Sequence, residues 1–297
     1  MELCLGTVQF GLDYGIKGLK KPAAADALRC LDYAVQNGVT ALDTAAAYGT
    51  AEEVVGSFLK QKTIARDRLF ISTKLLPNIL DDVRQQDYRR VIRENLQKSL
   101  AVLHTDYVDA YLLHSARYAF CPQILDALAD VRREGLAKTV GVSVYEPEEA
   151  CACMEHENMG LIQVPYSLLD HRMKESGVFK KAGANFCRVA VRSAFLQGLV
   201  TLEKNQIPDF LKKAGPVLQK IDRISRETGK SRIELAMGYV KKEASVSYLV
   251  FGVDSAEQLA EDIGAFQEEL PQELYQEIET ECRGIGEDIV IPSLWKK

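Results

Sequence analysis

Short apolar segments alternate with longer amphipathic segments along almost the whole chain. The apolar runs comprise residues 3–10, 41–45, 69–75, 108–115, 138–144, 161–167, 187–193 and 247–253. Runs this rich in Val, Ile and Leu are typical of parallel strands that are buried on both faces. The pattern therefore predicts eight buried strands, with an amphipathic helix after each.

Helix-start signals lie between these runs. Pro22 is predicted at the first helical position, and Gly38 is predicted to end the same helix. A Ser or Thr followed three residues later by Glu or Gln predicts a capping box. Pairs of this kind that mark predicted helix starts are Thr50 with Glu53, Ser231 with Glu234, and Ser255 with Gln258.

Alternation of strands and helices indicates parallel βαβ units. Eight units in this length predict an α/β protein whose residues 1–297 form a single-domain (β/α)8 TIM barrel. The competing fold is an open doubly wound sheet, which usually carries G-x-G-x-x-G after its first strand. Here the first run is followed by "FGLDYGIKG", which lacks that spacing.

Composition and charge exclude several classes of function. The apolar fraction of 47% and the charged fraction of 27% are those of a globular protein. A formal charge of −5 gives no basic surface for nucleic acid. No apolar run reaches the ~18 residues of a membrane span, and "MELCLGTVQF" does not resemble a signal peptide. We therefore expect a cytoplasmic protein with no nucleic-acid or membrane partner.

The chain has seven cysteines, an odd number at scattered positions. This usage favours free thiols in a reducing compartment over a disulfide framework. Cys151, Cys153 and His156 form a possible metal-binding group. Residues two apart on a helix face different sides, so no metal site is predicted there.

Four polar side chains fall at or just after predicted strand ends, where the catalytic face of such a barrel forms. Asp43, Lys74 and His114 end the second, third and fourth runs, and Tyr48 follows the second. Each of these residues alone has a simpler structural explanation. Asp43 and Lys74 would form a structural ion pair beside Tyr48, and His114 would be a histidine of the core. Convergence of all four on one face favours a catalytic group instead.

The chemistry of these four groups suits proton donation to an oxygen that gains negative charge. A free phenol titrates near ~10, and an adjacent ammonium lowers that pKa. Asp43 would keep Lys74 charged, Lys74 would tune Tyr48, and His114 would bind a substrate oxygen. Carbonyl reduction needs such a donor, and a nicotinamide cofactor would have to supply the hydride.

The motifs "GVTALDTAAAYGTAEE", "FISTKL" and "DAYLLHS" resemble, in order and spacing, those of the aldo-keto reductase superfamily. The resemblance continues through "GVSVY", "IQVPYSLLD" and "RSAFLQGLV" to "VFGVDSAEQLAED". It implies a barrel that binds NADP(H) without a Rossmann domain. It further implies that Tyr48 is the general acid/base, that Lys74 and Asp43 tune it, and that His114 positions the carbonyl of a small-molecule substrate.

The same resemblance implies a set of cofactor-binding positions. At the nicotinamide end they are Gly6, Thr7, Ser143, Gln163, Arg192 and Ser193; around the pyrophosphate, Leu196, Gln197 and Gly198; at the adenosine end, Gly252, Ser255, Gln258, Glu261 and Asp262. The family often has Asn after the serine of "GVSVY", where this chain has Val144. Where Arg192 and Ser193 lie, the family commonly supports the nicotinamide ring, often with an aromatic residue that is absent here.

The last strand-to-helix loop departs further from the family pattern. Members that bind the 2′-phosphate often carry Lys or Arg there, whereas residues 252–258 include Asp254 and Glu257 and no basic residue. Carboxylates repel a phosphate dianion. Lys204, Lys212 and Lys213 in the long segment 202–216 are the cations that remain within reach. NADP(H) is favoured by resemblance, and NAD(H) is the alternative.

Two other functions compete with carbonyl reduction. Lys74 as a Schiff-base nucleophile would make an aldolase, but that chemistry needs a neutral, unpaired amine. A nicotinamide-binding module that senses redox state with little turnover is the second alternative.

The residues expected to form the substrate pocket are Tyr14, Tyr118, Phe120, Phe195 and Trp295. Arg117 is expected to bind an acidic group of the substrate, and the tail that carries Trp295 is expected to cover the barrel mouth as a flap. The sequence pattern predicts no oligomeric state.

Overall fold

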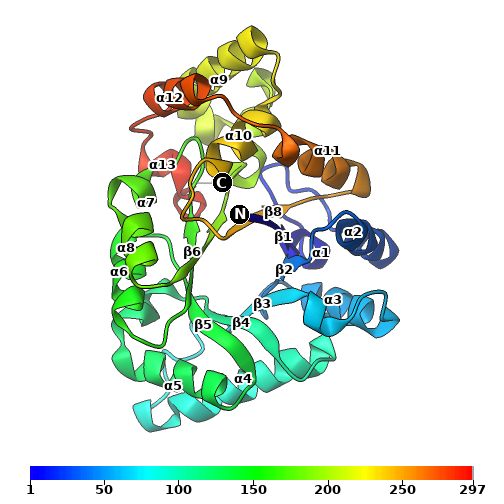
Figure 1. The fold of residues 1–297 in the computed structure, drawn as a ribbon, viewed down its shortest axis with the longest axis vertical. Coiled ribbons are helices and arrows are strands. Elements are labelled where there is room, and N and C mark those ends of the chain that lie inside the picture. The colour runs from blue at the N-terminus through cyan, green and yellow to red at the C-terminus, as the bar shows by residue number, and fades with distance from the viewer. Residues whose placement is uncertain (296–297) are drawn as a thin grey trace.

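Eight parallel strands close into a barrel in the computed structural model, which describes residues 1–295. The helices surround the barrel on the outside (Figure 1). This confirms the (β/α)8 prediction. The strands are β1 (Glu2–Gly6), β2 (Ala41–Asp43), β3 (Phe70–Lys74), β4 (Val108–Leu113), β5 (Ala137–Ser143), β6 (Leu161–Pro165), β7 (Arg188–Arg192) and β8 (Tyr248–Gly252).

Every predicted strand exists, but most end earlier than the apolar runs do. The largest difference is at the first run, where β1 stops at Gly6 and residues Val8–Gly11 form the helical turn α1. Phe10 of this turn is buried in the main hydrophobic core, although it is not part of the sheet. Burial alone does not distinguish a strand from a helical turn in so short a run.

The helices follow the strands in sequence and cover the sheet. They are α2 (Ala24–Gln36), α3 (Ala51–Gln61), α4 (Tyr88–Leu103), α5 (Pro122–Arg133), α6 (Pro147–Glu155), α7 (Arg172–Glu175), α8 (Val178–Ala184), α9 (Gly215–Thr228), α10 (Arg232–Lys241), α11 (Ala256–Gln267), α12 (Gln272–Glu281) and α13 (Glu287–Val290). Short 3-10 turns are η1 (Arg66–Arg68), η2 (Gln85–Asp87), η3 (Ala116–Phe120), η4 (Leu196–Thr201), η5 (Lys204–Gln206), η6 (Asp209–Ala214) and η7 (Pro292–Leu294).

The predicted helix starts are only partly correct. Ser231 forms a complete capping box with Glu234 at α10. Ser255 caps α11 through the amide of Gln258, while the Gln258 side chain accepts from the amide of Asp254. Thr50 precedes α3 but makes no side-chain cap. α2 begins two residues beyond Pro22, with Ala23 at its N-cap.

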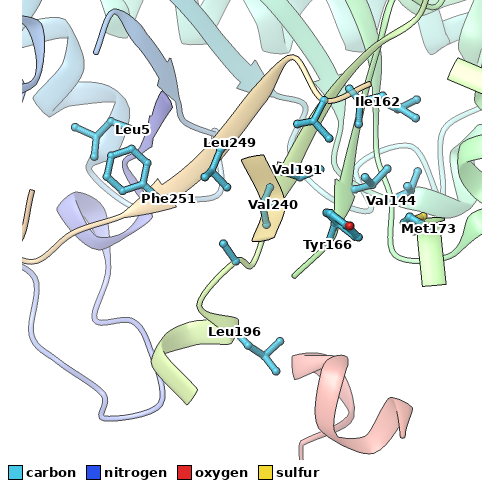
Figure 2. Close-up of a cluster of buried hydrophobic side chains, with 14 of the residues drawn as sticks. Leu5, Val144, Ile162, Tyr166, Met173, Val191, Leu196, Val240, Leu249 and Phe251 are labelled. Atoms are coloured by element: carbon cyan, nitrogen blue, oxygen red, sulfur yellow. The ribbon is translucent and has the colours of Figure 1, made fainter. Parts of the chain in front are cut away.

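The hydrophobic core lies mainly between the barrel and its helices. Figure 2 shows Val191 of β7 and Leu249 of β8 beside Val240 of α10. The interior of the barrel holds a second, smaller cluster that includes Ala110, Leu112 and Leu161. Successive strand residues face opposite sides, so the strand residues that alternate with the core residues point into the barrel. Polar side chains at the strand ends therefore face the barrel mouth.

The long segment 202–216 is not an open loop, because it folds into η5 and η6 before α9 begins at Gly215. The C-terminal tail packs against it. The Trp295 ring is 6.2 Å from the Phe210 ring, and its Nε1 donates to the carbonyl oxygen of Ile289 at 3.0 Å. Trp295 is therefore a buried anchor for the tail, as its size suggests.

Candidate active site

Sheet register brings the carboxyl ends of β1 to β3 to the same level. Gly6 pairs with Asp43, and Asp43 pairs with Ser72, two residues before Lys74. His114 directly follows β4. Parallel strands of a barrel end at one face, so these side chains gather there even though they are far apart in sequence. The structure therefore brings Asp43, Lys74 and His114 together at one face of the barrel.

Asp43 and Lys74 form a buried ion pair at the base of this face. Lys74 Nζ donates to Asp43 Oδ2 at 2.6 Å and to the carbonyl oxygen of Thr44 at 3.0 Å. Asp43 Oδ1 accepts from Ser72 Oγ at 2.6 Å and from Gln163 Nε2 at 2.8 Å. The Lys74 side chain is 0% exposed. A buried charge needs such partners, and here both charges have them.

Tyr48 is held over this pair by the close approach of two loops. Gly49 has a φ of 55°, and a Cβ there would lie 2.4 Å from the carbonyl oxygen of Gly11. A Cβ at Gly11 would lie 1.7 Å from the carbonyl oxygen of Tyr48. Only glycine fits at both positions, so α1 and the Tyr48 turn can touch. Lys74 Nζ lies 5.0 Å from the centre of the Tyr48 ring.

The electrostatics keep Tyr48 and His114 uncharged at neutral pH. Burial raises the pKa of Tyr48, and the Lys74 ammonium offsets only part of that effect. Burial and the Lys74 charge lower the pKa of His114 to about 3. Burial alone would lower the pKa of Lys74, but Asp43 reverses this, so the net shift is upward. Lys74 acts in the expected direction on Tyr48, but burial outweighs it.

His114 and Tyr48 face each other edge to face, with 5.6 Å between ring centres. Both line a cavity of about 650 Å³ at the carboxyl ends of the strands. Lining residues among the predicted cofactor positions are Gly6, Ser143, Gln163, Arg192, Ser193, Leu196, Gln197, Gly198, Gly252, Gln258 and Asp262. The cavity thus extends from Tyr48 to α11.

Some predicted residues do not line this cavity. Thr7 is buried, and its Oγ1 donates to the backbone oxygen of Asp43 at 3.1 Å. Ser255 caps α11, Glu261 is exposed, and Lys74 lies beneath the lining. Their contact with a cofactor stays a prediction.

The predicted substrate pocket is also only partly assembled. Tyr14 and Phe195 line the cavity. Tyr118 and Arg117 instead bind Asp81, and Phe120 is exposed. These three are not lining residues because the turn η3 carries them away from the mouth. The tail contributes Pro292 and Ser293 to the lining in place of Trp295.

Residues from three further segments line the cavity and were not found from the sequence. They are Gln9, Ile16, Lys17 and Leu19 after β1, Tyr145 after β5, and Ile233 of α10. The amide of Ile16 donates to the carbonyl oxygen of Gln197 at 3.1 Å, so the loop after β1 reaches the loop after β7. No local signal marks such a contact; the glycines of "FGLDYGIKG" indicate only that the backbone turns there.

A second hydrogen-bonded network lies beside the ion pair. Ser143 Oγ donates to Gln163 Oε1 at 3.0 Å, and Gln163 in turn donates to Asp43. Arg192 Nη2 donates to the carbonyl oxygen of Val144, the residue after Ser143, at 2.9 Å. Ser143 and Gln163 are therefore both fixed in place at the cavity wall.

The loop after β7 has an unusual backbone. Ser193, Leu196 and Gln197 have φ values of 67°, 48° and 55°, and Gly198 follows at 94°. Left-handed φ at residues other than glycine costs of order 1–3 kcal/mol each, and such strain clusters at ligand sites. The predicted pyrophosphate segment is therefore held in a conformation that local preference does not favour.

Carboxylates dominate the α11 end of the cavity. Asp254 and Asp262 both line it, and the Asp262 side chain is 0% exposed. Two of the three lysines expected to reach this end are paired elsewhere, Lys212 with Asp209 and Lys213 with Asp288. Among residues 1–295, the basic side chains that line the cavity are Lys17 and Arg192, and neither belongs to β8 or α11.

Three buried polar groups on the lining have no hydrogen-bond partner within the described chain. They are His114 Nδ1, Gln197 Oε1 and both oxygens of Asp262. Buried polar atoms are nearly always satisfied, so orphans along one cavity indicate a polar ligand. Their spread, from the catalytic end to α11, fits an extended dinucleotide.

Asp262 gives a stability prediction. Burial and the nearby Glu261 raise its pKa to about 7. The folded state therefore holds this proton more tightly than the unfolded state, and its stability falls as pH rises from about 4 through 7. Asp262→Asn should add up to about 4 kcal/mol to the free energy of unfolding at pH 8, and almost nothing at pH 4.

Urea unfolding at the two pH values measures this effect. Glu273→Gln, at an exposed position on α12, is the control and should change stability only slightly. An equal effect of Asp262→Asn at pH 4 and pH 8 would show that the carboxyl group does not titrate in this range.

Within the part of the chain that the structure describes, no group of three His, Cys, Asp or Glu side chains is arranged to hold a metal ion. His156 Nε2 lies 3.0 Å from Asp126 Oδ1, and all seven cysteines are free thiols. Across residues 1–295, none of the helices has the length and apolarity that a membrane crossing requires.

The closed barrel and its polar mouth define a TIM-barrel protein with a candidate acid–base site. Residues 2–281 match the model of the aldo/keto reductase family, so the chain belongs to that family. Membership implies an oxidoreductase that acts on carbonyl compounds and uses a nicotinamide cofactor.

Similar proteins agree with this assignment. The chain is 27% identical over 255 residues to the uncharacterized oxidoreductase YqkF of Bacillus subtilis, covering 80% of this chain and 81% of that protein. It is 28% identical over 334 residues to protein tas of Escherichia coli K12, covering 93% and 92%. The fold matches that of the aldo-keto reductase AKR11C1 from Bacillus halodurans (holo form), with a TM-score of 0.79, 24% identity and coverage of 97% and 95%.

Proposed function

We propose that the chain reduces an aldehyde or ketone to an alcohol with a reduced nicotinamide cofactor, and that Tyr48 donates the proton. One observation carries this proposal. The buried Asp43–Lys74 pair lies directly below a protonated phenol and a neutral imidazole, in a cavity long enough to continue to α11. The family assignment supports the reaction class.

The roles of the four groups follow from their geometry. The bound cofactor would supply hydride to the carbonyl carbon. Tyr48 would give its proton to the carbonyl oxygen, and Lys74 would stabilise the phenolate that remains. Asp43 holds Lys74 protonated, and Ser72 and Gln163 orient Asp43. The neutral His114 would bind the carbonyl oxygen through a ring N–H.

Ser143, Gln163, Ser193 and the strained segment 196–198 would hold the cofactor's nicotinamide and pyrophosphate. All of them line the cavity. Gly252, Gln258 and Asp262 would lie along the adenosine, with the N-terminus of α11 close by. Ser255 would act through its cap of that helix. Thr7 and Glu261 would contribute from behind the lining.

The geometry does not support Schiff-base chemistry at Lys74. Its ammonium is protonated, bound to Asp43 and Thr44, and located beneath the cavity wall. A nucleophilic lysine has to be neutral and in contact with substrate. The redox-sensing alternative shares the cofactor site and differs only in turnover.

The cofactor itself has two candidates. Family resemblance favours NADP(H). The carboxylates of Asp254 and Asp262, together with the pairing of Lys212 and Lys213, favour NAD(H), because nothing cationic on β8 or α11 lines the cavity to bind a 2′-phosphate. A free ribose hydroxyl can instead donate to a carboxylate, as it does in other NAD sites.

Calorimetric titration of the purified protein with NADPH and with NADH tests the proposal. We expect micromolar or tighter binding of at least one of them, and the ratio of the two affinities shows what the acidic α11 end selects. Lack of binding by both would contradict the proposed function. Turnover with p-nitrobenzaldehyde then separates an enzyme from a redox sensor, because the sensor would bind cofactor without consuming it.

A further inference from the structure

Arg192 is a partly buried cation that lines the cavity beside Tyr48 and His114. Within residues 1–295 it has no acidic partner at ion-pair distance. Lys74, the other cation at this end, is neutralised by Asp43. Arg192 is therefore an uncompensated positive charge at the end of the cavity that Tyr48 and His114 line.

The guanidinium of Arg192 is fixed in position by three contacts. Nη2 donates to the carbonyl oxygen of Val144 at 2.9 Å, and Nη1 donates to Ser193 Oγ at 3.3 Å. Its central carbon lies 4.4 Å from the centre of the Tyr145 ring. A planar guanidinium stacked on a ring and hydrogen-bonded at two nitrogens cannot easily turn away from a ligand.

The charge of Arg192 affects the pKa values of Tyr48 and His114, the two groups proposed to contact the substrate. Burial dominates the pKa of Tyr48, and Lys74 and Arg192 both act to lower it. The pKa of His114 falls because of burial and Lys74, with a further contribution from Arg192. Interactions of this kind are strong in a partly buried site, where water and salt screen them poorly.

Hydride transfer requires the nicotinamide ring to lie close to the same groups, and therefore close to Arg192. The carbonyl oxygen must come within about 2.6–3.2 Å of its proton donor, and the reacting carbons must approach to about 3–3.5 Å. The ring is neutral in the reduced cofactor and a pyridinium cation in the oxidised cofactor. A fixed cation near the ring therefore discriminates between the two redox states.

We propose that Arg192 makes this site bind the reduced nicotinamide cofactor more tightly than the oxidised one, through repulsion between its guanidinium and the pyridinium ring. The inference rests on the proposed function. It has a consequence for the direction of the reaction, because the oxidised cofactor formed by carbonyl reduction would dissociate faster than the reduced cofactor that replaces it.

Titrations with both redox forms of whichever dinucleotide binds test the proposal. The wild-type protein should bind the reduced form at least about tenfold more tightly than the oxidised form. Arg192→Gln, which keeps a hydrogen-bonding side chain and removes the charge, should reduce that ratio by about fivefold or more. Arg192→Lys, which keeps the charge, should leave the ratio close to the wild-type value.

Arg188→Gln is a matched control on the same strand. Arg188 lies at the opposite end of β7, also near an aromatic ring, 5.3 Å from the centre of Phe70. Removing its charge should not change the ratio, because the cofactor cavity lies at the other end of the barrel.

Several outcomes would overturn the inference. Equal affinity of the wild-type protein for the two redox forms would do so even if no variant folds. An unchanged ratio in Arg192→Gln would do so while leaving the proposed function intact. If that variant lost kcat/KM only for a carboxylate-bearing aldehyde and not for its neutral analogue, Arg192 would serve substrate binding instead. Binding of neither redox form would refute the proposed function itself.

Discussion

Replacing Tyr48 with Phe should lower kcat for carbonyl reduction by about 10²–10⁴-fold, because the change removes the hydroxyl that we propose as the proton donor. The ring, its contact with Lys74 and its edge-to-face contact with His114 all remain possible in the variant. Cofactor affinity should therefore stay within about twofold of the wild-type value. Steady-state kinetics and calorimetry on the same preparation measure both quantities.

A control variant tests whether the loss of activity is specific to the hydroxyl of Tyr48. Tyr14→Phe removes the hydroxyl of another tyrosine that lines the cavity, and it should have a much smaller effect on kcat. Wild-type kcat in Tyr48→Phe would show that another group donates the proton. A large loss of cofactor affinity would show that Tyr48 acts mainly in binding.

Breaking the buried ion pair should have the largest effect on stability. Asp43→Asn leaves the Lys74 ammonium without its carboxylate, and Lys74→Met leaves the Asp43 carboxylate without its ammonium. Each change should lower the free energy of unfolding by about 3–5 kcal/mol, since an uncompensated charge then remains buried. Both should also abolish most of the activity. Urea unfolding monitored by circular dichroism measures the first effect.

The double variant Asp43→Asn/Lys74→Met provides the sharper test. It removes both charges, so its stability loss should be smaller than the sum of the two single losses. Glu94→Gln, which breaks the exposed pair with Arg90 on α4, is the control and should cost less than about 1 kcal/mol. Additive losses in the double variant would mean that the two charges do not stabilise each other.

The sequence predicted the fold and the catalytic end of the site because both depend on local patterns. Eight apolar runs separated by amphipathic segments are compatible with few folds other than a closed barrel. Asp43, Lys74 and His114 stand at strand ends, and parallel strands of a barrel end at one face. Strand order alone therefore brings them together, whatever the details of packing.

The sequence predicted less at positions where loops from distant segments meet. Tyr118 and Arg117 resemble pocket residues by type, but η3 turns them toward Asp81. Lys212 and Lys213 were expected near the adenosine end of the cavity because segment 202–216 was expected to be an open loop. The turns of segment 202–216 pair Lys213 with Asp288 of α13 instead. Loop conformation depends on contacts with other loops, and a residue's type does not reveal them.

The sequence by itself determined the barrel, the order of its strands and which four polar side chains are candidates for catalysis. Tertiary structure decided how those groups are charged: burial keeps the Tyr48 phenol protonated, although Lys74 acts to lower its pKa. It also placed Arg192 beside them, without an acidic partner among residues 1–295. Charge at a site depends on desolvation and on neighbours brought in from other strands, and both exist only once the chain has folded.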